Sequence, residues 1–256
     1  MLLILAPSKT QKFISRDFFR FTQPLLLEKS CFLADHLKSL SRPELADIMK
    51  LSKKLTDETY NRIHNFTPPL TIRNSRQAIF TFQGDAYSQL NPGDYSEEEL
   101  LYSQKYLHIL SGLYGILRPL DLIFPYRLEM GLKLNIPAAG NLYHYWGDEP
   151  TRIINSSLTE TDSTRLVNLA STEYIKAVNR QKLDGELITV VFKQKKNGNY
   201  KTIPIYAKKA RGLMTHFAIV NRIEKADDLK SFDLDGYIYS RNESTKGIWL
   251  FKKELD

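Results

Sequence analysis

The chain has 256 residues, 42% of them hydrophobic and 25% charged, and its 36 basic and 29 acidic side chains give a formal net charge of +7. These proportions are typical of a globular protein and exclude a disordered chain or a fibre. No apolar stretch approaches the ~20 residues that a membrane span needs, so we expect no membrane partner. The N-terminal apolar run ends at Pro7 without a basic region before it, and the single cysteine, Cys31, lies among apolar neighbours. We therefore expect a cytoplasmic protein without a disulfide.

Apolar runs and capping residues predict interleaved strands and helices in the first half of the chain. Ser41 and Ser96 are each followed three positions later by glutamate, which is the capping-box signature of a helix start. The Ser96 helix is expected to run to about Leu110. In chain order, the pattern predicts a strand over 2–6, helices within 24–64, a loop over 67–76, a strand over 78–82 and an irregular region over 111–147.

The second half alternates in the same way. The dipeptide Asn197-Gly198 is a strong hairpin signal between two apolar runs. The predicted elements are helices over 149–158, 171–178 and 208–223, strands over 166–170, 187–192 and 200–207, and a final hairpin over 236–239 and 247–251. No linker divides the chain. We therefore predict one domain over residues 1–256 of the α/β class (mixed α+β), with a mixed sheet and antiparallel hairpins surrounded by helices.

The positive charge is concentrated in one window. Residues 176–222 contain 11 lysines and arginines against only Asp184 and Glu186, which is a net charge of +9, so the rest of the chain sums to −2. A concentrated basic surface indicates an anionic partner such as nucleic acid, a nucleotide or phosphate. An ordinary solvated face is the alternative.

The predicted helix 208–223 places part of this charge in register. At 100° per residue, Lys208, Arg211, Thr215 and Arg222 fall within roughly 60° of one face, opposite an apolar face. Such a stripe suits a phosphate backbone, and Lys209 adds to it. The flanking hairpin supplies further cations: Lys193, Lys195, Lys196 and Lys201.

Two further stretches suit anion binding. Gly112 and Gly115 form a Gly-x-x-Gly turn after the capped helix, followed by Arg118, which is the sequence shape of a helix-hairpin-helix that grips DNA phosphates. A plain helix C-cap at Gly112 is the alternative. Ser8 and Lys9 follow the first strand, where an open sheet binds anions, but no Gly-rich phosphate loop is present.

The candidates for catalysis are Lys9, Asp85, Arg127 and Glu129. Arg127 and Glu129 stand among apolar residues, so they form either a structural ion pair or part of a site. Asp85 follows a glycine and is either a turn residue or a catalytic carboxylate. The five histidines are never closer than 28 residues and no Cys-x-x-Cys exists, so we predict no metal site and no cofactor.

These stretches resemble the YaaA family of bacterial peroxide-stress proteins. The matching segments are Pro7–Thr10, Gly84-Asp85 with Tyr87, Leu110–Asp121, Pro125–Gly131, Trp146–Asp148, Asn168–Ser171 and Tyr206–Met214. The resemblance implies a cytosolic protein that keeps free intracellular iron low, which limits Fenton damage. It also implies DNA binding through a helix-hairpin-helix in a positive cleft. His216 stands where the family pattern has an arginine, which weakens the basic stripe at neutral pH.

The sequence thus leaves two main hypotheses. The first is a protein that binds double-stranded DNA without sequence specificity. The second is an enzyme acting on a phosphorylated or nucleotide-like small molecule in a pocket lined by Lys9, Arg127 and Lys208. One cavity holding these cations would favour the second, and a wide groove would favour the first. Direct iron sequestration has little support, because no ligand spacing is present. No protein partner is indicated.

Overall fold

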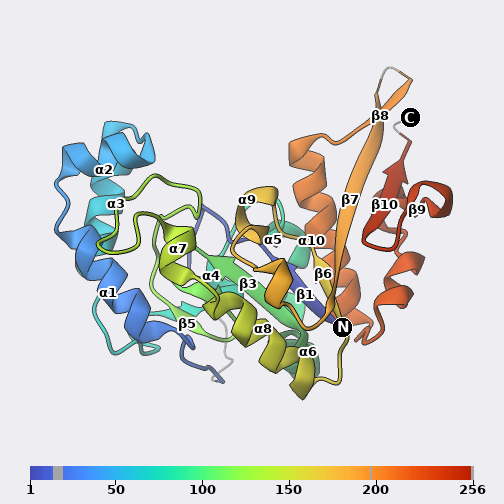
Figure 1. The fold of residues 1–256 in the computed structure, drawn as a ribbon, viewed down its shortest axis with the longest axis horizontal. Helices are drawn as coiled ribbons and strands as arrows, with labels where there is room; N and C mark the ends of the chain where they lie inside the picture. The colour runs from blue at the N-terminus through green and yellow to red at the C-terminus, as the bar shows by residue number, and fades with distance from the viewer. Residues whose placement is uncertain (14–19, 197, 255–256) are drawn as a thin grey trace.

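A computed structural model describes residues 1–13, 20–196 and 198–254 of the chain. Its main sheet has the strand order β4-β3-β1-β6-β7-β10-β9, and β8 pairs with β7 (Figure 1). A separate pair of strands, β2 and β5, forms a small antiparallel sheet. The strands are β1 (Leu2–Leu5), β2 (Arg76–Gln77), β3 (Leu107–Ser111), β4 (Gly115–Leu117), β5 (Leu122–Ile123), β6 (Arg165–Asn168), β7 (Glu186–Lys196), β8 (Asn199–Lys201), β9 (Ile238–Tyr239) and β10 (Ile248–Lys253). This mixed sheet confirms the predicted fold class.

The centre of the main sheet is parallel. Strand β1 pairs with β3 on one side and with β6 on the other, and β7 and β10 continue in the same direction. All four residues of β1 are buried, as expected for a parallel strand covered on both faces. The apolar run at the start of the chain therefore predicts the central strand correctly.

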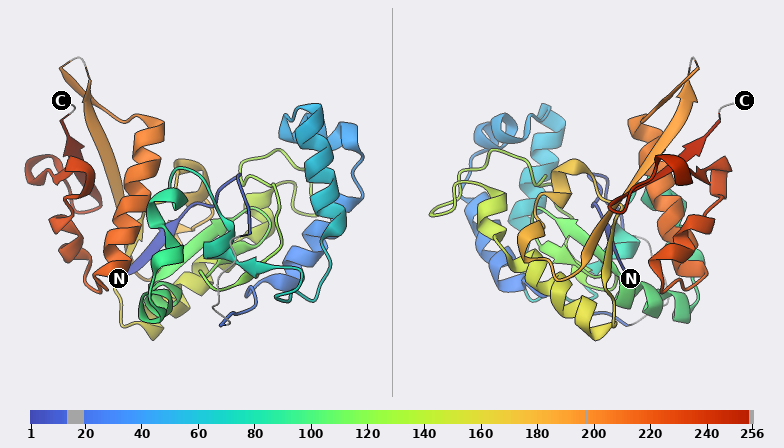
Figure 2. Two further views of the ribbon diagram at one scale, coloured as in Figure 1. Left: turned by 180° about the vertical axis from the view of Figure 1, so that it is seen from behind. Right: turned by 45° about the vertical axis from the view of Figure 1, so that its right-hand side comes forward.

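Helices surround the sheet (Figure 2). Helices α1 to α3 stand at one end of the molecule, and α10 with the strands β7 to β10 stands at the other. The longer helices are α1 (Leu27–Lys38), α2 (Arg42–Met49), α3 (Lys53–Asn65), α6 (Glu97–Tyr106), α8 (Glu149–Glu160) and α10 (Pro204–Val220). The short ones are α4 (Ala78–Thr81), α5 (Tyr87–Leu90), α7 (Leu142–Trp146) and α9 (Thr172–Ile175). The 3-10 helices are η1 (Pro92–Asp94), η2 (Arg180–Lys182), η3 (Ala226–Ser231), η4 (Leu234–Gly236) and η5 (Arg241–Glu243).

Local capping signals are confirmed. The side chains of Ser41 and Ser96 each accept a hydrogen bond from the backbone N–H three residues on. The carboxylate of the glutamate at that position accepts one from the backbone N–H of the serine. Each box satisfies backbone N–H groups that have no partner inside the helix.

Two predicted elements are wrong. Residues 78–82 were expected to form a strand, but Ala78–Thr81 is a short buried helix, because a short apolar run does not distinguish a buried strand from a buried helix. The helix beginning at Ser96 ends at Tyr106, not near Leu110. Residues Leu107–Ser111 instead form β3, since pairing with the buried strand β1 outweighs the helix preference of leucine.

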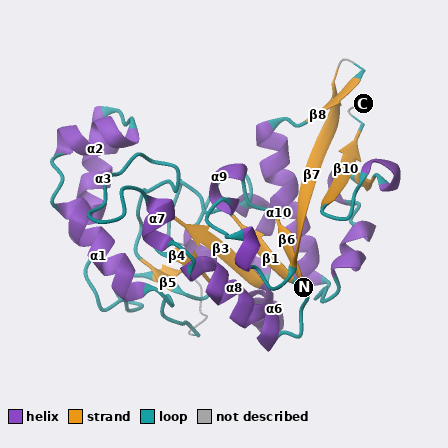
Figure 3. Ribbon diagram, viewed as in Figure 1, coloured by secondary structure: helices purple, strands orange, loops and turns teal. Residues whose placement is uncertain are grey.

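The turn at Gly112 and Gly115 is therefore not a helix-hairpin-helix. It joins β3 to β4, which pair in antiparallel register, so strands flank it on both sides (Figure 3). Every residue from 111 to 117 is buried, which keeps the backbone of this turn away from any duplex.

The basic window forms the long hairpin β7–β8 and the helix α10. The predicted hairpin is confirmed by the pairing of Gln194 with Lys201, although Asn197 lies outside the described residues. The second strand ends at Lys201 and the helix begins at Pro204, earlier than expected, because proline is well tolerated in the first turn of a helix. The final hairpin is confirmed as β9 and β10.

Candidate functional site

The order of the strands in the main sheet reverses beside β1. From β1 the chain continues to β3 on one side, and from there it crosses to β6 on the other side of β1. In open α/β sheets, ligands bind at the carboxyl ends of the strands where the strand order reverses in this way. A cavity of about 420 Å³ lies there, and we call it the switch-point cavity. Its lining residues include Ser8, Lys9, Asp85, Tyr87, Glu129, Ser171, Glu173, Tyr174, Lys208 and Arg211.

The loop after β1 is held in place by hydrogen bonds from three directions. The Tyr87 hydroxyl donates to the carbonyl of Ala6 at 2.9 Å, and the Gln83 N–H donates to the carbonyl of Thr10 at 2.9 Å. The Tyr126 N–H donates to Gln11 Oε1 at 2.7 Å. These contacts place the backbone of Ser8 and Lys9 in the cavity wall.

A charged cluster lies at one side of the cavity. Lys9 Nζ is 2.7 Å from Glu129 Oε1, and Arg127 Nη2 is 3.6 Å from the same oxygen. The Glu129 side chain is only 10% exposed, so its negative charge depends on these two cations. The second oxygen, Oε2, is buried and makes no hydrogen bond to any described residue.

Gly112 explains how Glu129 reaches this position. A Cβ at Gly112 would lie 2.2 Å from the carbonyl oxygen of Leu128, so only glycine lets the β3–β4 turn pack directly on the 128–129 backbone. The Gly112 carbonyl also accepts a hydrogen bond from Trp146 Nε1 at 2.9 Å. Gly112 is thus a packing residue behind the cavity and does not line it.

Two cations enter the cavity from α10. Lys208 is exposed, whereas Arg211 is half-buried and its Nε makes no hydrogen bond to any described residue. Burial lowers the pKa of Arg211, but a guanidinium stays charged in proteins. Gly212 allows this placement, because a Cβ there would lie 2.0 Å from the carbonyl oxygen of Ala86.

These segments, brought together from distant parts of the chain, also match a known family. Residues 1–243 match the family described as "Peroxide stress protein YaaA". This chain belongs to the YaaA family. It is also 46% identical to a UPF0246 protein of Alteromonas mediterranea, over 100% of both chains. Several of the segments on which the YaaA resemblance rests contribute lining residues, among them Lys9, Asp85, Glu129, Ser171 and Arg211.

The predicted basic stripe on the last long helix is wrong in part. Thr215 is fully buried, and its hydroxyl donates to the Arg211 carbonyl at 2.8 Å. Arg222 lies beyond the last residue of α10 and pairs with Glu98. Lys209 is half-buried and does not line the cavity. Of this predicted stripe, only Lys208 and Arg211 line the switch-point cavity, because part of the face that the sequence pattern makes polar is buried in the fold.

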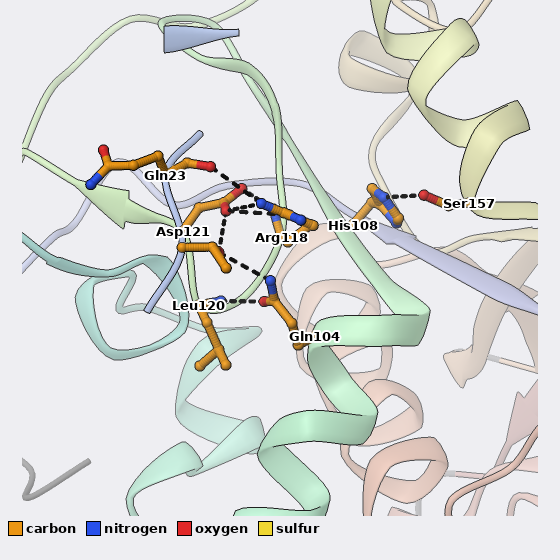
Figure 4. Close-up of polar contacts among 8 residues, drawn as sticks. Gln23, Gln104, His108, Arg118, Leu120, Asp121 and Ser157 are labelled. Carbon is orange, nitrogen blue, oxygen red and sulfur yellow. Dashed lines mark hydrogen bonds and ion pairs between the residues drawn. The ribbon is translucent and has the colours of Figure 1, made fainter. Parts of the chain in front are cut away.

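Two of the predicted anion-binding residues lie elsewhere. Gly115 is buried in the β3–β4 hairpin, next to the Trp146 ring. Arg118 points to Asp121, with Nη2 at 2.9 Å from Oδ1, and donates to the Gln23 carbonyl at 3.2 Å (Figure 4). Arg118 therefore belongs to a structural network around a fully buried carboxylate, although it also lines a second cavity of about 460 Å³.

That second cavity also contains a buried histidine. His108 Nε2 lies 3.2 Å from Ser157 Oγ, while its Nδ1 makes no hydrogen bond to a described residue (Figure 4). Burial, with a smaller contribution from the charge of Arg118, lowers the pKa of His108 to about 4. His108 is therefore neutral at physiological pH.

The structure places Arg127 and Asp85 differently with respect to the cavity. Arg127 pairs with Glu129 but lines a small neighbouring cavity and not the switch-point cavity itself. Of the predicted pocket residues Lys9, Arg127 and Lys208, the switch-point cavity therefore contains only Lys9 and Lys208. Asp85 lines the cavity from the loop before α5, where it is half-buried.

The predicted catalytic and anion-binding residues do not include those that α9 contributes, although the YaaA resemblance covers Ser171. Ser171 caps α9 directly after β6, and Glu173 Oε1 accepts a hydrogen bond from the Gly131 N–H at 2.9 Å. Tyr174 closes the same wall. The helix cap after a strand is visible in the sequence, but only the pairing of β6 with β1 brings it beside Lys9.

Within the described part of the chain, no three histidine, cysteine, aspartate or glutamate side chains come together as ligands for a metal ion. Among residues 1–13, 20–196 and 198–254, no helix combines the length and the apolar character that crossing a bilayer requires.

Proposed function

We propose that this YaaA-family protein acts in peroxide stress by binding a phosphate-bearing ligand of nucleotide size in the switch-point cavity. The single observation behind this proposal is the entry of two cations, Lys208 and Arg211, into a cavity at the carboxyl ends of β1 and β6. The volume of about 420 Å³ falls in the ~300–1,000 Å³ range of small-molecule sites. Membership of a family described by peroxide stress supports the cellular role.

The electrostatics of the cavity support an anion on its α10 side. Lys208 and Arg211 form no ion pair with another described residue, whereas Lys9 is already paired with Glu129. A phosphate between Lys208 and Arg211 would accept charge-assisted hydrogen bonds, each worth about 1.5–3 kcal/mol. The same site would serve an enzyme, with Glu129, Lys9 and Asp85 as the candidate acid–base groups.

The test is direct binding of AMP and of methyl phosphate, measured by calorimetry. We expect K208A and R211A each to weaken the affinity for both ligands about ten-fold or more, because each variant removes one charge-assisted contact. K209A is the matched control, since Lys209 lies one residue from Lys208 but outside the cavity. Unchanged affinity in K208A and R211A, or equal loss in K209A, would exclude this site.

Double-stranded DNA is a second candidate ligand, favoured by the cations outside the cavity. Lys196 and Lys201 are exposed on the β7–β8 hairpin, and Lys208 is exposed on α10, which packs against β7. Lys195 and Lys182 contribute less to such a surface, because they pair with Glu254 and Asp148. Binding without sequence specificity would use phosphate contacts alone.

A salt titration with a short duplex tests this second candidate. Double substitution of Lys196 and Lys201 by alanine should reduce the slope of log K against log salt by about 0.9 for each lost phosphate contact. A slope that stays the same would remove the hairpin from the DNA surface. The lowering of free iron stays a prediction from the resemblance, which comparison of chelatable iron in a deletion strain and a K208A/R211A strain would test.

A further inference from the structure

Two buried polar atoms of the cavity lining are without a partner in the described structure. Glu129 Oε2 is an acceptor and Arg211 Nε is a donor, and neither makes a hydrogen bond to a described residue. A buried polar atom left unsatisfied costs folding free energy, and each such atom in a native protein therefore calls for an explanation. A ligand that satisfies both atoms supplies one.

The two atoms require hydrogen-bonding groups of opposite kind on that ligand. Arg211 needs an acceptor, which a phosphate oxygen provides. Glu129 is held next to Lys9 and Arg127, and an ionised carboxylate only accepts hydrogen bonds. A phosphate oxygen placed against Glu129 would meet a like charge in a poorly solvated position, which is unfavourable. The group facing Glu129 must therefore be a neutral hydrogen-bond donor.

The rest of the Glu129 carboxylate is fixed, which makes its second oxygen a specific contact point. Oε1 is occupied by Lys9 at 2.7 Å, and the backbone of residues 128–129 is packed against Gly112. Because Oε1 already accepts from Lys9, Oε2 is the oxygen that remains for a further donor. This is the arrangement that recognises a sugar hydroxyl or a base N–H beside a bound phosphate.

We propose that Glu129 is a specificity residue that accepts a hydrogen bond from a neutral hydroxyl or N–H on the organic part of the ligand. The ligand would then be a phosphate ester such as a sugar phosphate or a nucleotide, and not inorganic phosphate or an uninterrupted DNA backbone, whose linkages offer no such donor. This inference rests on the proposed function, because the phosphate itself is assigned to Lys208 and Arg211.

The experiment compares a graded set of phosphate esters on the full-length protein by calorimetry. Methyl phosphate has no donor on its organic part, ribose 5-phosphate offers hydroxyls, and 2′,3′-dideoxy-AMP offers the N–H of the base. In the wild-type protein we expect ribose 5-phosphate, 2′,3′-dideoxy-AMP or both to bind at least ten-fold more tightly than methyl phosphate. The member of the pair that retains the preference identifies the source of the donor.

The variant E129Q should reduce that preference several-fold, because a neutral acceptor makes a weaker hydrogen bond than a carboxylate. Its affinity for methyl phosphate should stay the same or rise, since a negative charge has been removed from the cavity. E58Q is the matched control, because it removes the same charge from an exposed position of α3 that does not line the cavity. Its preference should equal that of the wild type.

The outcomes separate the two proposals. If no phosphate ester binds, or binding is independent of Lys208 and Arg211, the proposed function fails and this inference fails with it. If methyl phosphate binds as tightly as the other two esters, or E129Q keeps the full preference, the inference alone is wrong. Thermal unfolding of E129Q and of E129A, which removes the carboxylate altogether, shows whether a loss of binding reflects loss of the fold. The inference requires that E129Q and E129A show the same loss of preference while both unfold at the wild-type temperature.

Discussion

The close approach of α10 to the loop before α5 allows a decisive test with Gly212→Ala. Gly212 lies in the interior of α10, where alanine is intrinsically favoured over glycine by about 1 kcal/mol. Helix propensity alone therefore predicts that G212A stabilises the protein. The structure predicts the opposite, because the new Cβ would lie 2.0 Å from the carbonyl oxygen of Ala86 and 2.8 Å from its carbonyl carbon.

The size of the effect follows from what would have to move. The contacting atoms belong to the backbone, so no side chain can rotate away, and α10 must separate from Ala86 by about 1 Å before the contact reaches 3.0 Å. Overpacking of this kind costs about 1–3 kcal/mol, and the loss of packing between α10 and α5 adds to it. After the propensity gain is subtracted, we expect a net destabilisation of about 1–2 kcal/mol.

The assay is urea and thermal unfolding of G212A beside the control G93A. Gly93 has no atom within 4 Å of its hypothetical Cβ, so G93A should change the free energy of unfolding by no more than about 0.5 kcal/mol. G212A should lower the melting temperature by about 2–8 °C. It should also weaken AMP binding, because Arg211 is the preceding residue. A G212A protein that is more stable than the wild type would refute the packing argument.

Three further predictions concern residues drawn in Figure 4. Burial lowers the pKa of His108 to about 4, whereas a histidine in the unfolded chain has a pKa near 6.5. The unfolded state therefore takes up a proton first as the pH falls. The contribution of His108 to stability is complete above pH 6.5 and is lost towards pH 4. Urea unfolding at pH 7.5 and 5.0 should show a loss of about 2 kcal/mol that H108Q lacks, and equal losses in both proteins would contradict the shift. D121A should cost about 3–5 kcal/mol, because Asp121 is fully buried and accepts hydrogen bonds from the Arg118 N–H, the Arg118 guanidinium and the Thr22 hydroxyl. Burial raises the pKa of Asp121, so the destabilisation in R118A should shrink as the pH falls and the carboxyl becomes protonated, and a loss that is independent of pH would contradict this account.

Short-range chemistry was sufficient to predict several elements from the sequence. Ser41 and Ser96 cap their helices through atoms only three residues away, and the buried run at the N-terminus forms the central strand. The hairpin around Gly198 also forms where turn chemistry places it. The helix caps and the hairpin depend on contacts within a few residues, and the N-terminal run is buried on both faces, as expected for a parallel strand.

The prediction failed where distant pairing outweighs local preference. Leu107–Ser111 continues a helix in the sequence pattern, yet the strand is formed because β1 offers it parallel hydrogen bonds and a buried position. Because of the same pairing, Gly112 and Gly115 lie in a buried β-hairpin and not in the predicted helix-hairpin-helix. The basic stripe was overestimated for a related reason, since periodicity places Thr215 on a polar face but does not reveal that this position is fully buried in the folded chain.

By itself, the sequence determined the chemical types in the site: a lysine after the first strand, a carboxylate among apolar neighbours, and a lysine and an arginine one turn apart. Only the tertiary structure decided that Lys9, Glu129 and Arg211 line one cavity, and that Arg118 lies outside it. The physical reason is that the site lies between parallel strands whose order depends on crossovers of many residues. Two close backbone contacts, at Gly112 and Gly212, then set the final positions, and such contacts become visible only when the chain is folded.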